Sequence, residues 1–324
     1  MENKSVIVTG GAGYIGSFMV KVLLEKGYMP IVIDNLSRNT KDVVPDGTPF
    51  YKVNVSDYET LRSIKEEYSP IGIIHFAGYI SMKESMEMPE LYFEQNVNES
   101  LKLLENMHKL GMNNIIFSST AGVYGNPERI PIKEGDRKEP TNPYGESKLI
   151  VERMLAWFYK IYGINYSVLR YFNACGAALD GSMGERHDPE THIIPIALKS
   201  LIENKDFLIY GTDYETEDGT CVRDYIHVLD LANAHILALE KIIESGGDRT
   251  YNVGNGTGFS NRQIVHAIEE VTGRKMNIKE VGRRPGDAGK LIADVSAIKE
   301  ELGFTPKYSD IHTIIDSAWK WHSK

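Results

Sequence analysis

The chain has 324 residues, of which 42% are hydrophobic and 25% charged, proportions that exclude disordered and fibrous proteins. At ~150 residues per domain, this length suggests about two domains. The formal net charge is −9 and no block is rich in lysine or arginine, which argues against a nucleic-acid partner. No apolar run approaches the ~20 residues of a membrane span, and the two cysteines cannot build a disulfide framework. We therefore expect no signal peptide, no membrane partner and a cytoplasmic location.

The first half of the chain alternates short apolar runs with longer amphipathic ones. We expect strands at 5–9, 30–34, 50–55, 71–76, 114–118 and 166–171, and helices between Gly16 and Gly27 and at 58–68, 91–110 and 144–162. Apolar strands that alternate with helices are typical of a parallel sheet buried on both faces. The expected fold class is α/β, with a Rossmann-type doubly wound parallel sheet.

After residue 172 the alternation becomes irregular. We expect a long loop at 173–192, helices near 195–203, 228–243 and 261–272, strands near 207–210 and 250–253, and a loop at 213–219. The pattern predicts a large sheet domain made of residues 1–172 and about 225–256. A smaller, mostly helical C-terminal domain would comprise about 173–224 and 257–324 and would hold the substrate.

A glycine pattern between the first strand and the first helix predicts a dinucleotide site. Gly10, Gly13 and Gly16 would let the backbone turn sharply and approach a pyrophosphate at the helix N-terminus. Asp34, which ends the second strand, would bind the adenosine ribose and favour NAD over NADP. Two basic residues just beyond it could instead meet the extra phosphate of NADP, namely Arg38 and Lys41. The large domain is therefore the predicted NAD-binding domain.

Tyr144 and Lys148 stand four residues apart at the start of a predicted helix and would share one face. A free phenol has a pKa of ~10, and a neighbouring ammonium favours its ionised form. Lowering the pKa to about 7 requires about 4 kcal/mol, which Lys148 and an oxidised nicotinamide could supply together. This spacing is common on helices, where it usually means a packed aromatic beside a solvated lysine. Its place behind a dinucleotide fold indicates a catalytic base.

At these residues the chain resembles the extended short-chain dehydrogenase/reductase superfamily, and within it the UDP-glucose/UDP-galactose 4-epimerases. The shared motifs cover nearly the whole chain, at residues 9–16, 34–36, 75–78, 118–125, 143–148, 169–173, 216–227 and 283–287. The resemblance implies that Tyr144 removes the proton of the C4 hydroxyl of a UDP-hexose while hydride passes to tightly held NAD. Thr120 would bridge that hydroxyl and the tyrosine, and Lys148 would bind the nicotinamide ribose. The 4-keto sugar would then turn, and hydride would return to its other face.

The resemblance also implies two sets of binding residues. The cofactor set comprises Gly10, Gly13, Tyr14, Ile15, Gly16, Asp34, Asn35, Asn54, Val55, Phe76, Ala77, Gly78, Asn96, Tyr144, Lys148 and Phe172. The substrate set comprises Thr120, Tyr144, Asn173, Tyr210, Arg223, Arg284, Asp287 and Leu291. The two arginines suit a diphosphate because a guanidinium offers paired donors to phosphate oxygens.

Three positions bear on how far the resemblance reaches. Ile80 stands where many of these epimerases carry a cofactor-binding lysine, and Asn54 replaces the usual aspartate near the adenine. Leu291 falls where side-chain size is thought to select the sugar. Leucine is intermediate in size, so acceptance of UDP-N-acetylglucosamine and UDP-N-acetylgalactosamine is a further hypothesis.

Two other functions are open to a chain of this kind. A sugar-nucleotide 4,6-dehydratase needs an acid and a base directly after the threonine, where this chain has Ala121 and Gly122. A non-catalytic NAD-binding regulator could dispense with Tyr144 and Lys148, both of which are present. The epimerase interpretation is therefore favoured over both alternatives.

The remaining candidates have structural explanations. His187, Asp188, Glu190 and His192 match no standard metal-site spacing, so we expect no metal. We expect His75 to be a hydrogen-bonded core residue and Cys175 a small buried one. The helix at 149–162 is apolar around most of its circumference, which predicts a homodimer, unless the C-terminal domain covers that face.

Overall fold

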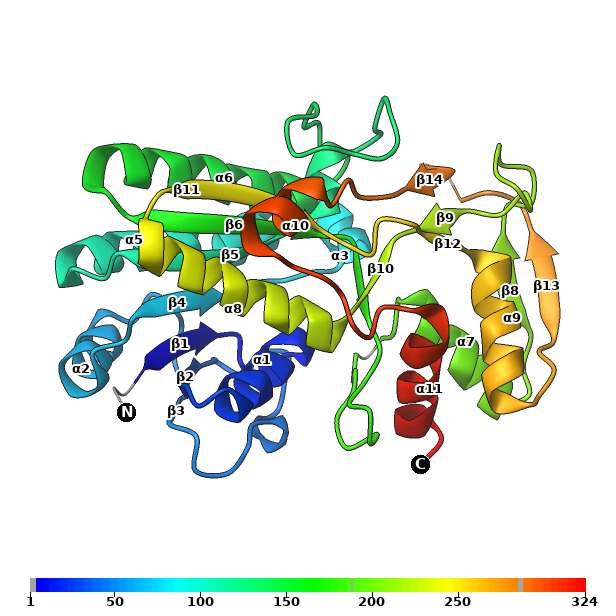
Figure 1. The fold of residues 1–324 in the computed structure, drawn as a ribbon, viewed down its shortest axis with the longest axis horizontal. Coiled ribbons are helices and arrows are strands. Elements are labelled where there is room, and N and C mark those ends of the chain that lie inside the picture. The colour runs from blue at the N-terminus through cyan, green and yellow to red at the C-terminus, as the bar shows by residue number, and fades with distance from the viewer. Residues whose placement is uncertain (1–3, 188, 285–287) are drawn as a thin grey trace.

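The computed structural model describes residues 4–187, 189–284 and 288–324, and it is built on one seven-stranded sheet (Figure 1). The strand order is β11–β6–β5–β4–β1–β2–β3, and every pair is parallel. The strands are β1 (Ser5–Thr9), β2 (Met29–Ile33), β3 (Phe50–Tyr51), β4 (Gly72–His75), β5 (Asn114–Thr120), β6 (Asn165–Tyr171) and β11 (Asp248–Val253). The order reverses between β1 and β4, the place where such sheets bind ligands at the carboxyl ends of their strands. The predicted Rossmann-type fold class is confirmed.

Helices cover both faces of the sheet. One face carries α1 (Tyr14–Glu25) and α8 (Val228–Ser245), and the other carries α2 (Tyr58–Tyr68), α5 (Glu99–Leu110) and α6 (Pro143–Tyr162). Each layer encloses its own apolar cluster, with Val6 and Val8 facing one cluster and Ile7 the other. Consecutive strand residues point to opposite faces, so an apolar strand supplies both cores.

The chain departs from the predicted elements at two places in the first half. The strand expected at 50–55 is only β3, because β3 lies at the edge of the sheet and pairs with β2 alone. The helix expected at 91–110 is preceded by α3 (Met82–Glu87) and α4 (Pro89–Tyr92), and it contains a π-helical segment, Phe93–Asn98. π-Segments of this kind are frequent at functional sites.

The second half contains more strands than the mostly helical domain we predicted. The helices are α7 (Ile193–Ile202), α9 (Asn261–Thr272), α10 (Ser296–Leu302) and α11 (Ile311–His322). The small sheets pair β7 (Asn173–Cys175) with β10 (Tyr225–His227), β8 (Phe207–Tyr210) with β13 (Ile278–Val281), and β9 (Val222–Arg223) with β12 (Phe259–Ser260) and β14 (Lys290–Leu291). Several of these strands have only two residues, too few to show a sequence period. Figure 1 shows α7, α9 and α11 grouped beside the main sheet, around their own apolar cluster.

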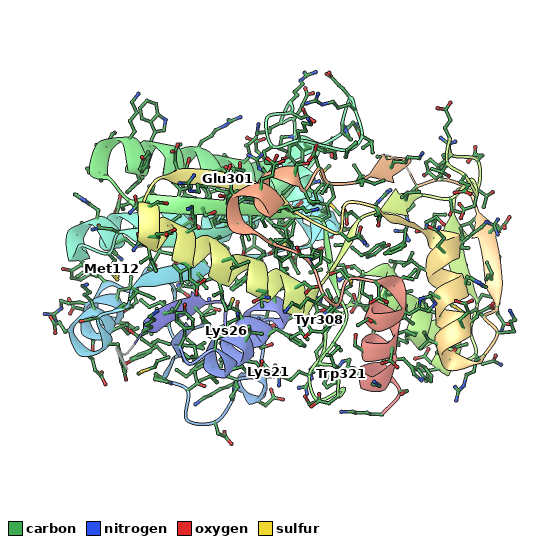
Figure 2. The ribbon with its side chains drawn as sticks, in the orientation of Figure 1. Lys21, Lys26, Met112, Glu301, Tyr308 and Trp321 are labelled. Atoms are coloured by element: carbon green, nitrogen blue, oxygen red, sulfur yellow. The ribbon has the colours of Figure 1, made fainter. Side chains whose placement is uncertain are left out.

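One C-terminal helix packs on the large sheet rather than with this group. Ile298 of α10 is fully buried in the apolar cluster that α1 and α8 share. Glu301 of α10 accepts a hydrogen bond of 2.8 Å from the Tyr251 hydroxyl of β11 (Figure 2). The division into two domains stays a prediction.

Within the described ranges, no helix combines the length and apolarity that a membrane span requires.

A buried ion pair fixes α6 to the sheet. Arg170 of β6 donates from Nε to Oε1 of Glu152 at 2.9 Å and from Nη2 to Oε2 at 2.6 Å. Ser119 of β5 donates to the same carboxylate at 2.6 Å, and Arg170 also donates to the Tyr124 hydroxyl at 2.9 Å. Both charged side chains are nearly inaccessible to solvent. The attraction between them therefore offsets the free-energy cost of burying each charge.

Removing one partner of this pair should destabilise the fold. We expect Arg170→Ala to lower the free energy of unfolding by about 3–5 kcal/mol, because the Glu152 carboxylate is left buried and uncompensated. Urea denaturation followed by circular dichroism measures this. Arg62→Ala, which removes an exposed ion pair with Glu59, is the control and should leave the midpoint unchanged. Equal midpoints for the two variants would contradict the prediction.

Candidate functional site

The turn between β1 and α1 is shaped by glycines. Gly10 has φ +70°, in the left-handed region, and a Cβ there would lie 2.6 Å from the backbone nitrogen of Ala77. A Cβ on Gly16 would overlap the carbonyl oxygen of Gly10. Gly13 is the N-cap of α1 and provides no side-chain cap, so no side chain competes for the first N–H groups of that helix. The turn therefore fits a pyrophosphate group.

Asp34 stands at the carboxyl end of β2, next to this turn. Its carboxylate accepts hydrogen bonds from the backbone N–H groups of Ala12 at 3.0 Å and Leu36 at 2.8 Å. Burial raises the pKa of Asp34, and these two hydrogen bonds work against that rise. The carboxylate is thus held in one orientation beside the glycine turn, as a ribose-binding residue would need to be.

The two basic residues beyond Asp34 are engaged elsewhere. Arg38 forms an ion pair with Glu84 at 2.7 Å, and its guanidinium lies 4.3 Å from the centre of the Tyr79 ring. The Lys41 ammonium lies 5.1 Å from the centre of the Phe50 ring. These contacts leave Asp34 as the dominant feature of the ribose position, in agreement with NAD rather than NADP.

The loop that follows β4 joins the glycine turn to the predicted catalytic residues. Phe76, Ala77 and Gly78 form this loop. A Cβ on Gly78 would lie 2.9 Å from Oδ1 of Asn96 and 3.6 Å from Nζ of Lys148. Glycine at this position therefore lets the loop pass close to the lysine.

Asn96 holds this loop in place through its side-chain amide. The amide accepts from the Tyr79 N–H at 2.7 Å and donates to the Tyr79 carbonyl at 3.0 Å and to the Ser147 hydroxyl at 2.9 Å. Both amide protons are used within the protein, so the contribution of Asn96 is to position the loop against α6.

The other predicted cofactor residues occupy the rim and the start of α1. Asn35 and Asn54 hydrogen-bond to each other at 2.8 Å, and Val55 belongs to the core. The Tyr14 hydroxyl donates to the carbonyl of Gly176 at 2.6 Å, while Ile15 is half-buried. Tyr14 therefore ties the glycine turn to the loop that follows β7.

Thr120, Tyr144 and Lys148 come together where β5 ends and α6 begins. Burial raises the pKa of Tyr144 and the nearby Thr120 hydroxyl lowers it in part, which places these two side chains together. Lys148 donates from Nζ to the carbonyl of Ser118 at 3.0 Å. The start of α6 is set by Pro143 in its first turn and by the N-cap Asn142, whose side chain accepts from the Gly145 N–H.

Burial dominates the electrostatics of this group. Burial raises the pKa of Tyr144 to about 12, and the Thr120 hydroxyl offsets it only in part. Burial lowers the pKa of Lys148 to about 8, against the opposing charge of Glu152. We expected a Tyr144 pKa near 7. The residues of the chain alone do not lower the pKa of Tyr144 to that value, because the effect of burial is larger than that of Thr120. The expected value also included the positive charge of an oxidised nicotinamide.

The predicted substrate residues form two groups. Arg223 and Leu291 are register partners in β9 and β14, and Leu291 packs against the same apolar cluster as Phe172. In the second group, the Arg284 guanidinium lies 3.7 Å from the centre of the Tyr210 ring. Asn173 donates to the carbonyl of Asp224 at 2.8 Å, whereas Asp287 lies outside the described residues.

Asp224 lies beside the predicted substrate residues Asn173 and Arg223 and was missed by our sequence analysis. Its fully buried carboxylate accepts backbone N–H bonds from Asn255 at 2.7 Å, Ala293 at 3.0 Å and Gly256 at 3.1 Å. Burial raises its pKa to about 6, and these bonds oppose that rise. The signal available in the sequence was its position directly after Arg223. It joins three segments that are far apart in the chain.

Tyr171 is a second residue that the sequence analysis missed. Burial raises its pKa, and the neighbouring Tyr144 adds to that effect, while a hydrogen bond with Ser118 opposes it. Its only signal in the sequence was its position within the family motif at 169–173. Tyr171 therefore stays a neutral phenol beside the candidate base.

Two structural expectations are confirmed. His75 is buried and hydrogen-bonds to Thr9 at 2.6 Å and Ser100 at 2.9 Å, and burial lowers its pKa to about 3. Burial raises the pKa of the Cys175 thiol, as expected for an unreactive core cysteine.

The residues after Thr120 are Ala121 and Gly122, which carry no group for acid–base elimination.

Residues 6–254 match the NAD dependent epimerase/dehydratase family. The UDP-glucose 4-epimerase of Lacticaseibacillus casei is 46% identical over 98% of this chain and 96% of its own length. The crystal structure of the UDP-glucose 4-epimerase from Brucella ovis in complex with NAD has a TM-score of 0.94 at 46% identity, covering 98% of this chain and 97% of that one. The enzyme from Bifidobacterium longum, in complex with NAD+ and UDP, has a TM-score of 0.90 at 35% identity, covering 99% and 98%.

A methyl group at Gly16 should damage the cofactor turn. We expect Gly16→Ala to reduce the NAD that copurifies with the protein by at least about tenfold, or ~1.4 kcal/mol, because the turn must open to admit the Cβ. Chromatography of nucleotide released on denaturation measures this. Gly135→Ala is the control, since its Cβ would meet no atom within 4 Å. Full NAD content in both variants would refute the prediction.

Proposed function

The chain belongs to the NAD dependent epimerase/dehydratase family, and from this membership we propose how its residues carry out the reaction. It is an NAD-dependent 4-epimerase that interconverts UDP-glucose and UDP-galactose through a 4-keto sugar. The observation that carries the proposal is the grouping of Thr120, Tyr144 and Lys148 at the end of β5, beside the loop that borders the glycine turn.

Tyr144 is the proposed base. Its phenolate takes the proton of the sugar C4 hydroxyl, and the Thr120 hydroxyl, which lies near the phenol, orients that sugar hydroxyl. The buried ammonium of Lys148 favours the ionised phenol. When bound, NAD would supply the hydride chemistry at C4, and the glycine turn and Asp34 would hold it. The reaction involves no net oxidation, so the cofactor can remain bound.

The diphosphate is assigned to the two arginines. Arg223 and Arg284 lie on different segments and present planar donors suited to phosphate oxygens. A 4,6-dehydratase is disfavoured by the apolar residues at 121 and 122, and a non-catalytic regulator by the retained group of Thr120, Tyr144 and Lys148.

Removing the phenol hydroxyl should stop the reaction without emptying the cofactor site. We expect Tyr144→Phe to lower the rate of UDP-glucose formation from UDP-galactose, with no added cofactor, by at least about 100-fold. NAD content should stay at the parental level. Tyr162→Phe, on the exposed end of the same helix, is the control and should retain full activity. Substantial activity in Tyr144→Phe would exclude this tyrosine as the base.

The sugar range is proposed to include the N-acetylated pair. Leu291 packs at the apolar cluster beside Phe172 and leaves more room than an aromatic side chain would. We expect turnover of both sugar pairs by the parent, and selective loss of the acetylated pair in Leu291→Tyr, measured as kcat/KM for each substrate. Absence of turnover of UDP-N-acetylglucosamine by the parent would remove this part of the proposal.

We also propose that the enzyme is a cytoplasmic homodimer. Apolar side chains on α6 remain exposed in the single chain, with Trp157 at 58% and Ile161 at 62%. We expect light scattering to give twice the chain mass for the parent and a smaller mass for Ile161→Glu, because a charge would be buried in the interface. Ile278→Glu, a change at an exposed isoleucine of β13, is the control. A monomeric parent at micromolar concentration would refute the dimer.

A further inference from the structure

The loop between β7 and α7 brings four potential metal ligands together. Glu185, His187, Glu190 and His192 each place a nitrogen or oxygen atom so that all four lie within 4.8 Å of one another. The sequence predicted no metal here, because the spacing of the histidines matches no standard site and Glu185 was not considered. Asp188, which was considered, lies outside the described residues.

The donor atoms converge on a single point of the loop. Oε1 of Glu185 lies 2.6 Å from Nδ1 of His187 and 2.7 Å from Nδ1 of His192. Oε1 of Glu190 lies 3.3 Å from the same nitrogen of His192. The contact of His187 with Glu185 is a hydrogen bond, and the buried Nδ1 of His192 faces carboxylate oxygens of both Glu185 and Glu190. Two imidazole nitrogens and two carboxylate oxygens gathered this closely are also the donor types that bind a shared cation.

The charges of the cluster require compensation. Glu185 is only 5% exposed, and a buried carboxylate needs a positive partner. Two carboxylates are balanced either by two protonated imidazoles or by one divalent cation with both imidazoles neutral. The short nitrogen–oxygen contacts hold the cluster together without an ion, and a divalent cation would take the place of the protons between these atoms.

The ligands are held in place by surrounding contacts. Glu190 accepts the backbone N–H groups of Thr191 at 2.7 Å and His192 at 2.8 Å, which fixes its carboxylate. The Trp321 indole of α11, labelled in Figure 2 beside this loop, donates to the carbonyl of Glu185 at 3.0 Å. Such outer contacts orient ligands in protein metal sites.

We propose that Glu185, His187, Glu190 and His192 form a closed structural site for one Zn²⁺ ion. Two imidazole nitrogens and two carboxylate oxygens suit tetrahedral Zn²⁺, whereas Mg²⁺ and Ca²⁺ prefer oxygen ligands throughout. The four ligands leave no open position, so the ion has no part in the sugar chemistry. It would cross-link the loop to the start of α7, and through Tyr14 and Trp321 that loop contacts α1 and α11.

Metal content of the full-length protein tests the proposal. After removal of metal with a chelator and reloading with ZnCl₂, elemental analysis should find about one Zn²⁺ per chain. Glu185→Gln and His192→Gln should each weaken Zn²⁺ binding at least about tenfold by titration calorimetry. His266→Gln is the matched control, because His266 also pairs with a glutamate, Glu270, but on an exposed helix surface. Its Zn²⁺ content should equal that of the parent.

Two further measurements guard against misfolded variants, because circular dichroism and NAD content should match the parent in all of them. A third measurement tests the geometry of the site: the parent loaded with Co²⁺ should show the intense visible absorption of a tetrahedral site. A parent that binds no stoichiometric Zn²⁺, or one whose Zn²⁺ persists after both substitutions, would overturn the proposal and leave an ion-pair cluster. Epimerase activity is assayed separately, so its failure would not bear on the metal site.

Discussion

The close packing of the start of α6 against the end of β5 determines the geometry of the proposed catalytic group, Thr120, Tyr144 and Lys148. A Cβ on Gly145 would lie 2.8 Å from the carbonyl oxygen of Gly122, so side chains are excluded from this contact. Because the backbones approach this closely, Tyr144 lies near the Thr120 hydroxyl at the end of β5. Lys148, one helical turn later, donates to the carbonyl of Ser118, two residues earlier in the strand. The ion pair of Arg170 and Glu152 anchors the same helix one turn later.

This packing has an electrostatic cost that the function explains. Lys148 is buried with a pKa lowered to about 8, and Tyr144 has a pKa raised to about 12, so the chain alone disfavours both ionised forms. If this position served stability alone, apolar side chains would be expected in place of a buried tyrosine and a buried lysine. If Tyr144 is the base that we propose, this arrangement keeps its proton in place until a positively charged cofactor completes the site.

Much of the fold could be predicted because most strands of the main sheet are buried on both faces. The bounds of β1, β8, α2 and α9 agree with those predicted from the sequence. Each of these segments has a recognisable pattern of apolar residues and is flanked by residues that favour turns. The two-residue strands β9, β12 and β14 could not be predicted, because tertiary pairing alone defines them. The motifs predicted that the glycine turn and Asp34 lie together and that Thr120, Tyr144 and Lys148 meet, while the roles of these residues stay predictions. The hub at Asp224 could not be predicted, since its three backbone partners are separated from it by 31 to 69 residues.

The loop after β7 shows why spacing alone was insufficient to find a ligand cluster. Glu185 joins His187, Glu190 and His192 because the loop folds back on itself between two fixed contacts, the Tyr14 hydroxyl on Gly176 and the Trp321 indole on Glu185. Tyr14 is also the first residue of the helix that follows the glycine turn. Order in the loop and order in the cofactor turn are therefore coupled through one phenol. A cross-link that stabilises the loop would also restrict motion at the cofactor turn without taking part in hydride or proton transfer.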